Sequence, residues 1–152
     1  MESVESARPA ESGAVASEIS REIVRLHARL YGRGPTKAKT HLNHDFALCV
    51  LEDVFMPAEK TLIGAGNSAQ VRATRDAFQL AVEKDFVAIV ERFTGRKVRA
   101  FFSQVHIPSE TAVELFVFAH DGEPRQDGDP PTDGDGRRDG SPRADGDGPP
   151  AD

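Results

Sequence analysis

The chain has 152 residues, a formal net charge of −6 and one cysteine, Cys49. A single cysteine excludes an internal disulfide and favours a reducing, cytoplasmic compartment. No apolar run approaches the roughly 20 residues that span a bilayer, which excludes direct membrane insertion and leaves peripheral association with a membrane complex.

Composition divides the chain into three parts, and the excess acid lies at both ends. Residues 1–16 are small and polar with net charge −2, and we predict that they are disordered. Residues 17–120 hold every Phe, Ile, Leu and Tyr and have net charge +2, so they form the single predicted domain. Residues 121–152 have net charge −6, repeat Asp-Gly every six residues, and contain only Ala144 and Ala151 as hydrophobic residues. This tail is predicted to be disordered, because it cannot bury enough surface to offset the cost of ordering its backbone.

The domain begins with a predicted helix over residues 17–31, for which Ser17 is a suitable N-cap. An apolar stripe at helical spacing supports it: Ile19, Ile23, Leu26 and Leu30. Glycines at 32 and 34 and a proline at 35 end the helix. Two strands are predicted next, at 38–42 and 46–52, with an Asn-His-Asp turn between them.

A short helix is predicted at 58–63, where Pro57 suits the first turn and Gly64 the end. A long helix follows, over residues 68–94, and its apolar stripe is Val71, Phe78, Val82, Phe86, Ile89 and Phe93. At about 1.5 Å per residue it is about 40 Å long, more than a domain of this size covers. We therefore expect part of its apolar face to contact another copy of the chain, in a homo-oligomer such as a dimer. The last two strands are predicted at 97–106 and 112–120.

The domain carries an internal repeat. The stretch EIVRLHARLYGR at 22–33 matches DFVAIVERFTGR at 85–96, with four of twelve positions identical. In both stretches a helical pattern ends at Gly-Arg, and two strand-like segments follow. The sequence therefore predicts an α+β domain of two αββ repeats, in which four strands form an antiparallel sheet with the helices on one face.

Four segments of the domain resemble a known family in the expected order: GRGPTKAKT at 32–40, EKTL at 59–62, TGRKV at 94–98 and FFSQVHIPSETAVELFVF at 101–118. The family is a domain of unknown function that takes its name from one component of a Na+-translocating, membrane-potential-generating system. The resemblance covers roughly residues 17–119, although EDVFMP at 52–57 departs from the connection typical of the family. It implies that some members associate with a membrane complex that handles ions or bicarbonate. It supplies no catalytic residues.

Basic residues cluster where each long helix gives way to a strand. The first set is Arg29, Arg33, Lys37, Lys39 and His41, and the second is Arg92, Arg96, Lys97 and Arg99. Arg donors beside flexible glycines suit phosphate or carboxylate groups. The candidate anion-binding residues are Arg33, Lys37, Lys39, Arg96 and Arg99. The alternative is structural, because glycines commonly cap helix C-termini and cations there favour the helix dipole.

Histidines and the cysteine are the remaining candidates for chemistry. His41, His44 and Asp45, with His106, offer zinc-type ligands, but their spacing matches no metal motif, so we predict solvated histidines and no metal site. Cys49 lies within the apolar strand FALCVLE and is expected to be a buried thiol rather than a nucleophile. We predict no catalytic residues, no cofactor and no enzymatic activity.

The leading functional hypothesis is an accessory or regulatory protein that acts through protein contacts. Its expected partners are further copies of itself and a membrane-transport protein. The alternative is a protein whose basic helix–strand junctions bind a small anion or nucleic acid. Nucleic acid is disfavoured, because the domain has net charge +2 and the chain has one Tyr and no Trp for base stacking.

Overall fold

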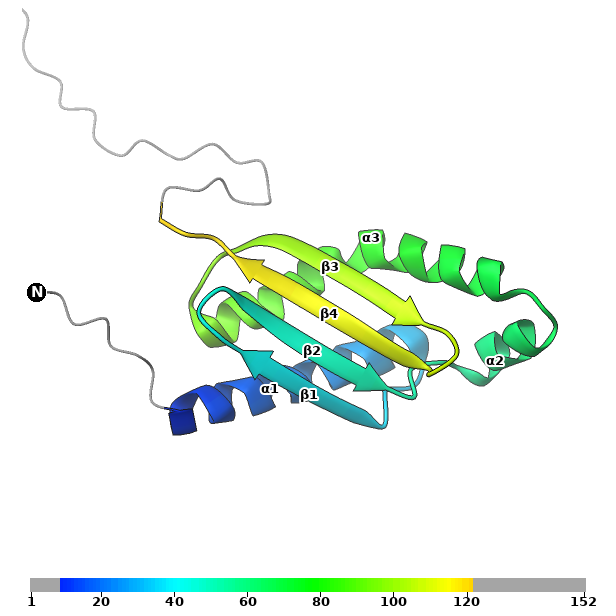
Figure 1. Ribbon diagram of the computed structural model, residues 1–152, viewed down its shortest axis with the longest axis horizontal. Helices are drawn as coiled ribbons and strands as arrows, with labels where there is room; N and C mark the ends of the chain where they lie inside the picture. The colour runs from blue at the N-terminus through cyan, green and yellow to red at the C-terminus, as the bar shows by residue number, and fades with distance from the viewer. Residues whose placement is uncertain (1–8, 122–152) are drawn as a thin grey trace, which may run out of the picture.

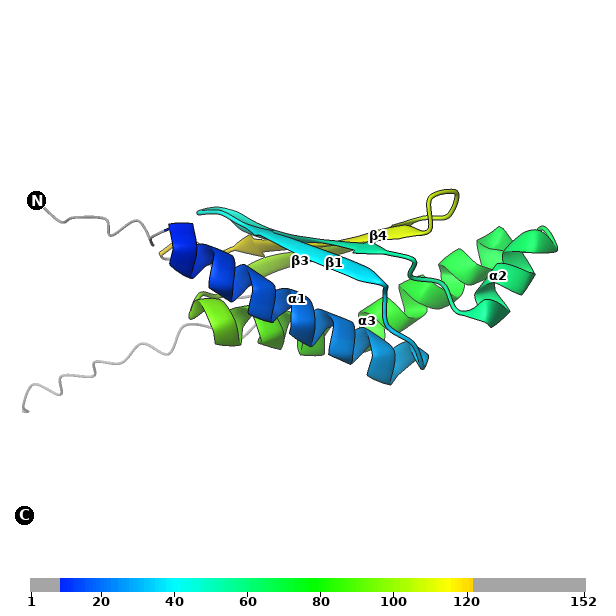
Figure 2. The same cartoon turned by 90° about the horizontal axis from the view of Figure 1, so that it is seen from below.

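A computed structural model describes residues 9–121 as two layers, one of helices and one of strands. The elements in chain order are α1 (Pro9–Tyr31), β1 (Lys37–Leu42), β2 (Phe46–Glu52), α2 (Pro57–Gly64), α3 (Ser68–Thr94), β3 (Val98–His106) and β4 (Thr111–Phe118). The strands form one antiparallel sheet in the order β1-β2-β4-β3, and both long helices lie on the same side of it (Figures 1 and 2). The predicted α+β class and the four-stranded antiparallel sheet are confirmed.

Two hairpins make the sheet, and their second strands meet at its centre. β2 pairs with β4, with Leu48 opposite Leu115 and Val50 opposite Val113. Each hairpin follows one of the long helices along the chain. The duplication itself stays a prediction from the sequence.

The core lies between the helices and the face of the sheet that they cover. Period-two alternation places one side of β2 and β4 inward. The fully buried side chains there include Cys49, Leu51, Phe116 and Phe118, which pack with Ile19, Ile23, Phe86 and Val90 from the helices. Phe101 joins the two layers, since its ring stacks on Phe86 at 5.9 Å and on Phe116 at 4.8 Å.

α1 is longer than the sequence pattern indicates, because it begins at Pro9 and not at Ser17. Proline is tolerated in a first helical turn, and Glu11 adds an acidic group at the positive end of the helix. Val15 packs against the core, so this extension is held by tertiary contacts as well as by alanine-rich composition. The expectation of a disordered segment is therefore wrong for residues 9–16. Residues 1–8 and the acidic tail from 122 onward lie outside the described part of the chain.

α3 has the predicted bounds, and its N-terminal half projects with α2 beyond the end of the sheet (Figure 2). Its inward stripe is buried at Val71, Val82, Phe86 and Ile89. Phe78 remains 40% exposed and Leu80 79% exposed, so the helix does present apolar surface to solvent. Whether another copy covers this surface stays a prediction.

Left-handed glycines end both long helices. Gly32 has φ 81° and Gly95 has φ 67°, and each donates its backbone N–H to the carbonyl four residues earlier, at 2.9 Å. This is the αL helix cap, in which a residue with a Cβ is strained. The structural alternative for these glycines is therefore the geometry observed.

Gly95→Ala is expected to lower the free energy of unfolding by about 1–2 kcal/mol. An added Cβ at Gly95 would meet no atom within 4 Å, so the cost comes from the backbone conformation alone. Gly95→Asn should cost less, because Asn tolerates the left-handed region. Urea denaturation measures the effect. Gly64→Ala is the matched control, since Gly64 ends a helix without a positive φ, and an equal loss there would contradict the explanation.

Candidate functional site

The first predicted anion-binding residue, Arg33, holds the loop that follows β2. Its guanidinium pairs with Asp53, with Nη2 2.6 Å from Oδ2, and Nη1 donates to the backbone carbonyl of Phe55 at 2.8 Å. The hydrogen bond between the side chains raises the pKa of Arg33 and lowers the pKa of Asp53. Arg33 is thus engaged in a structural ion pair.

The second junction lies at the other end of β2. Arg96 donates from Nη1 to the carbonyl of His44 at 2.5 Å, and its guanidinium lies 4.2 Å from the ring centroid of Phe118. Arg99 lies at the irregularity of β3 between Val98 and Ala100. Because His44 precedes β2 and Asp53 follows it, the fold separates the two arginine junctions and does not join them into one site.

Lys37 and Lys39 lie with His41 on β1, an edge strand. They line a shallow groove of ≈ 560 Å³ whose other walls include Val50 and Glu52. Lys37 Nζ lies 3.3 Å from a Glu52 carboxylate oxygen. Of the predicted anion-binding set, these two lysines are the pair that the structure places around one groove.

The histidines do not converge in the way a metal site needs. His41 belongs to β1, whereas His106 ends β3 at the opposite edge of the sheet and contacts Ser109 at 2.7 Å. His44 stacks on His120 with ring centroids 6.0 Å apart. Among residues 9–121, no group of three or more His, Cys, Asp or Glu residues has metal-binding geometry.

Cys49 is fully buried on the helix-facing side of β2. Desolvation by burial raises the pKa of its thiol to about 11, against the opposing effect of a hydrogen bond with Thr40. A reactive cysteine needs an accessible thiolate at neutral pH. Cys49 instead packs as a small apolar side chain.

A buried ion pair that sequence reasoning does not reveal ties α2 to α3. Arg75 is 8% exposed and donates from Nε and Nη2 to the two carboxylate oxygens of Glu59, at 2.7 and 2.8 Å. Nη2 also donates to the carbonyl of Val54 at 2.6 Å. The guanidinium lies 4.6 Å from the ring centroid of Tyr31 and 4.9 Å from that of Phe55. This charge is thus surrounded by an acid, a carbonyl and two rings, as a buried arginine requires.

Beside Arg75 is a polar cavity of ≈ 20 Å³ between the helices and the sheet, with room for about one water molecule. Among the described residues, three buried side-chain atoms have no hydrogen-bond partner: His27 Nδ1, Gln79 Nε2 and Glu114 Oε2. All three residues line this cavity. Burial raises the pKa of Glu114 to about 8 and, together with the charge of Arg75, lowers the pKa of His27 to about 4. Near neutral pH both groups are therefore uncharged.

Sequence signals for these buried polar residues do exist. Glu114 occupies an inward position of the alternating strand TAVELFVF, between Ala112 and Phe116. Arg75 lies four residues after Val71 on the apolar stripe of α3. A charged residue that interrupts an apolar period indicates a buried, partnered charge. The partners themselves come from other elements, and the period does not identify them.

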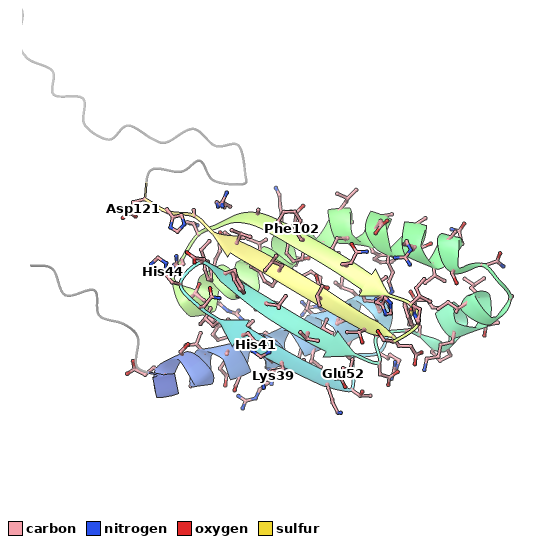
Figure 3. The ribbon with its side chains drawn as sticks, viewed as in Figure 1. Lys39, His41, His44, Glu52, Phe102 and Asp121 are labelled. Atoms are coloured by element: carbon pink, nitrogen blue, oxygen red, sulfur yellow. The ribbon has the colours of Figure 1, made fainter. Side chains whose placement is uncertain are left out.

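The other side of the sheet carries no helix in the described structure, and we call it the open face (Figure 2). Its side chains are those that alternate with the buried ones: Lys37, Lys39, His41, Phe46, Leu48, Val50, Glu52, Ala100, Phe102, Gln104, His106, Thr111, Val113, Leu115 and Val117. Figure 3 looks onto it, with Lys39 and His41 along the β1 edge and Phe102 across the sheet on β3. Phe102 is 59% exposed. The centre of the open face is apolar and the two edges are polar.

The pairing register orders the open face into rows across the four strands. One row runs Lys39, Val50, Val113, Gln104, and the next runs His41, Leu48, Leu115, Phe102. An apolar centre with a polar rim is the composition of protein–protein interfaces. A contiguous apolar surface of this kind is uncommon on a monomer that contacts nothing.

The fold and the open face define a small α+β protein with a surface suited to protein contacts. The chain belongs to the family described as "Na+-translocating membrane potential-generating system (MpsC)", which it matches over residues 11–120. The predicted family is confirmed. The "Uncharacterized protein YbcI" of Bacillus subtilis (strain 168) is 26% identical over 112 residues, which cover 73% of this chain and 90% of that protein. No solved structure matches significantly.

The helices give no direct link to a membrane. Within residues 9–121, none is both long enough and apolar enough to cross a bilayer.

Proposed function

We propose that this protein is a non-enzymatic accessory or regulatory protein that acts through protein contacts made by its open face. The observation that carries the proposal is the row of apolar side chains at the centre of that face, uncovered in the described structure and rimmed by polar residues. The family description supports a partner class, a membrane ion- or bicarbonate-handling complex. In this proposal the protein works at the cytoplasmic side of such a complex and binds it peripherally.

Affinity purification from the native membrane fraction tests the proposal, with wild type compared to Leu115→Glu. Leu115 lies at the centre of the open face, where a carboxylate would have to be desolvated on binding. We expect the variant to lose ion-transport proteins that wild type retains. Leu80→Glu, which adds the same charge at a 79% exposed site on α3, is the matched control. Identical co-purified sets from wild type and Leu115→Glu would contradict the proposal.

The groove along β1 supports a second candidate function, binding of a small anion or of nucleic acid by Lys37 and Lys39. The ion pair of Lys37 with Glu52 competes with it. Fluorescence anisotropy with single-stranded RNA and DNA, and calorimetry with phosphate, test this candidate at low salt, where phosphate contacts are strongest. Binding that weakens in Lys39→Gln would support it, and a flat titration would eliminate it.

A further inference from the structure

The open face is nearly symmetrical about a line that runs parallel to the strands between β2 and β4. Across this line Leu48 is opposite Leu115, and Val50 is opposite Val113. A half-turn about such a line, placed above the sheet, would lay β2 of one copy over β4 of another. Leucine would then meet leucine and valine would meet valine, in side chains of matched size.

We propose that the open face binds a second copy of this chain, sheet against sheet, about a two-fold axis that runs parallel to the strands. The inference rests on the proposed function, in which the open face is a protein-contact surface, and names the occupant. Two sheets that pack face to face keep their strands roughly aligned and lie about 10 Å apart. The contact is isologous, as two-fold interfaces are.

The charges on the edge strands select this axis. With the axis parallel to the strands, β1 of one copy lies over β3 of the other. His41 then faces Phe102, and Lys39 faces Gln104, which are pairings of a polar or cationic group with an aromatic ring or an amide. An axis perpendicular to the strands would instead lay β1 over β1, so that Lys37 and Lys39 of the two copies would repel each other.

The size of the open face predicts a reversible dimer. Four strands at a spacing of about 4.8 Å, over about eight residues at about 3.3 Å each, give a face of about 500 Å². Two such faces bury about 1,000 Å², close to the minimum for a specific interface. The dimer should therefore form in the micromolar range and dissociate on dilution.

Sedimentation equilibrium of the full chain tests the occupant. We expect a mass that rises with concentration from the 16.5 kDa of one chain to twice that value. Leu115→Glu and the milder rim variant Phe102→Asp should remain at the mass of one chain. Phe102 is 59% exposed, so its replacement does not disturb folding. Leu80→Glu should dimerise as wild type does. A monomeric wild type, or a dimer lost only in Leu80→Glu, would overturn the inference.

Cross-linking tests the orientation. Single variants His41→Cys and Phe102→Cys are mixed and treated with a short thiol-to-thiol cross-linker, because sheets about 10 Å apart exceed the reach of a disulfide. The buried Cys49 is present in wild type as the control. We expect cross-linked dimers in the mixture and few in either variant alone. Efficient linking of His41→Cys to itself would overturn the strand-parallel axis.

These outcomes separate the two proposals. If wild type is a monomer but Leu115→Glu loses its membrane partners, the second-copy inference fails and the contact surface stands. If wild type dimerises as described but purifies with the same proteins as Leu115→Glu, the inference stands and the accessory role through this face fails.

Discussion

Arg75→Met is expected to lower the free energy of unfolding by about 3–5 kcal/mol, the usual cost of removing one partner of a buried ion pair. Glu59 is 7% exposed, and both its carboxylate oxygens accept from Arg75. Without the guanidinium, that carboxylate would be a buried charge that keeps the hydrogen bond from the backbone N–H of Met56 at 2.8 Å and loses its counter-ion. The carbonyl of Val54 would also lose its donor. Chemical denaturation followed by circular dichroism measures the loss.

Two further variants show whether the stranded charge causes the effect. Arg72→Met removes the same charge from an exposed position on α3 that donates to the Val105 carbonyl, and it should cost about 1 kcal/mol or less. The double variant Arg75→Met with Glu59→Gln removes the buried charge, because Gln keeps an acceptor for Met56, and should be more stable than Arg75→Met alone. Equal losses for the two arginine variants would refute the assignment of Arg75 as a structural anchor.

Stability is expected to fall as the pH rises above about 6.5, and Glu114 is the cause. Burial raises the pKa of Glu114 from 4.5 to about 8 in the folded state. The folded chain therefore holds a proton that the unfolded chain releases, and the stability from this group is complete below pH 4.5 and lost as the pH approaches 8. The slope is about 1.4 kcal/mol per pH unit.

His27 acts in the opposite direction at lower pH. Burial and Arg75 lower the pKa of His27 from 6.5 to about 4. Its contribution is present above pH 6.5 and is lost as the pH falls toward 4. The two slopes cancel between about pH 4.5 and 6.5, so these groups together predict a plateau there and a loss of about 2 kcal/mol between pH 6.5 and 8.

Urea unfolding in a series of buffers tests this profile. Glu114→Gln keeps the shape of the side chain and removes its ionisation, so the fall above pH 6.5 should flatten. The charged groups facing Glu114 are Arg75 from α3, with its partner Glu59 on α2, and Asp76 at the cavity, and the variant leaves them in place. Asp85→Asn, at an exposed position of α3, should leave the fall unchanged. A steep fall that persists in Glu114→Gln would rule out this carboxyl as the source.

Most elements follow from local patterns. The strand at 46–52 and the helix at 68–94 have the predicted bounds, because period two and an apolar helical stripe are local signals. Glycines that end the two long helices are equally legible, since the cap conformation depends on one residue. The start of α1 is not, because Val15 is held by the core and its own neighbours carry no strong cap.

The candidate sites show where sequence reasoning stops. It groups Arg33 with Arg96 because both follow a Gly at a helix end, and the fold places them at opposite ends of β2. It offers His41 and His106 as possible ligands, and the strand order separates them to opposite edges. Spacing along the chain gives the chemistry of a residue, whereas the distance between two residues depends on strand order and register.

The sequence by itself determined the class of fold, the family, and the division into a mildly basic domain between acidic ends, because each depends on composition or on short periodic patterns. Only the tertiary structure decided which side of the sheet the helices cover, and therefore that Leu48 and Leu115 belong to an open face. It alone brought Glu59 to Arg75, and His27 to the cavity that Glu114 also lines. The physical reason is that burial and pairing are properties of contacts between elements, and a local pattern specifies an element without specifying its neighbour.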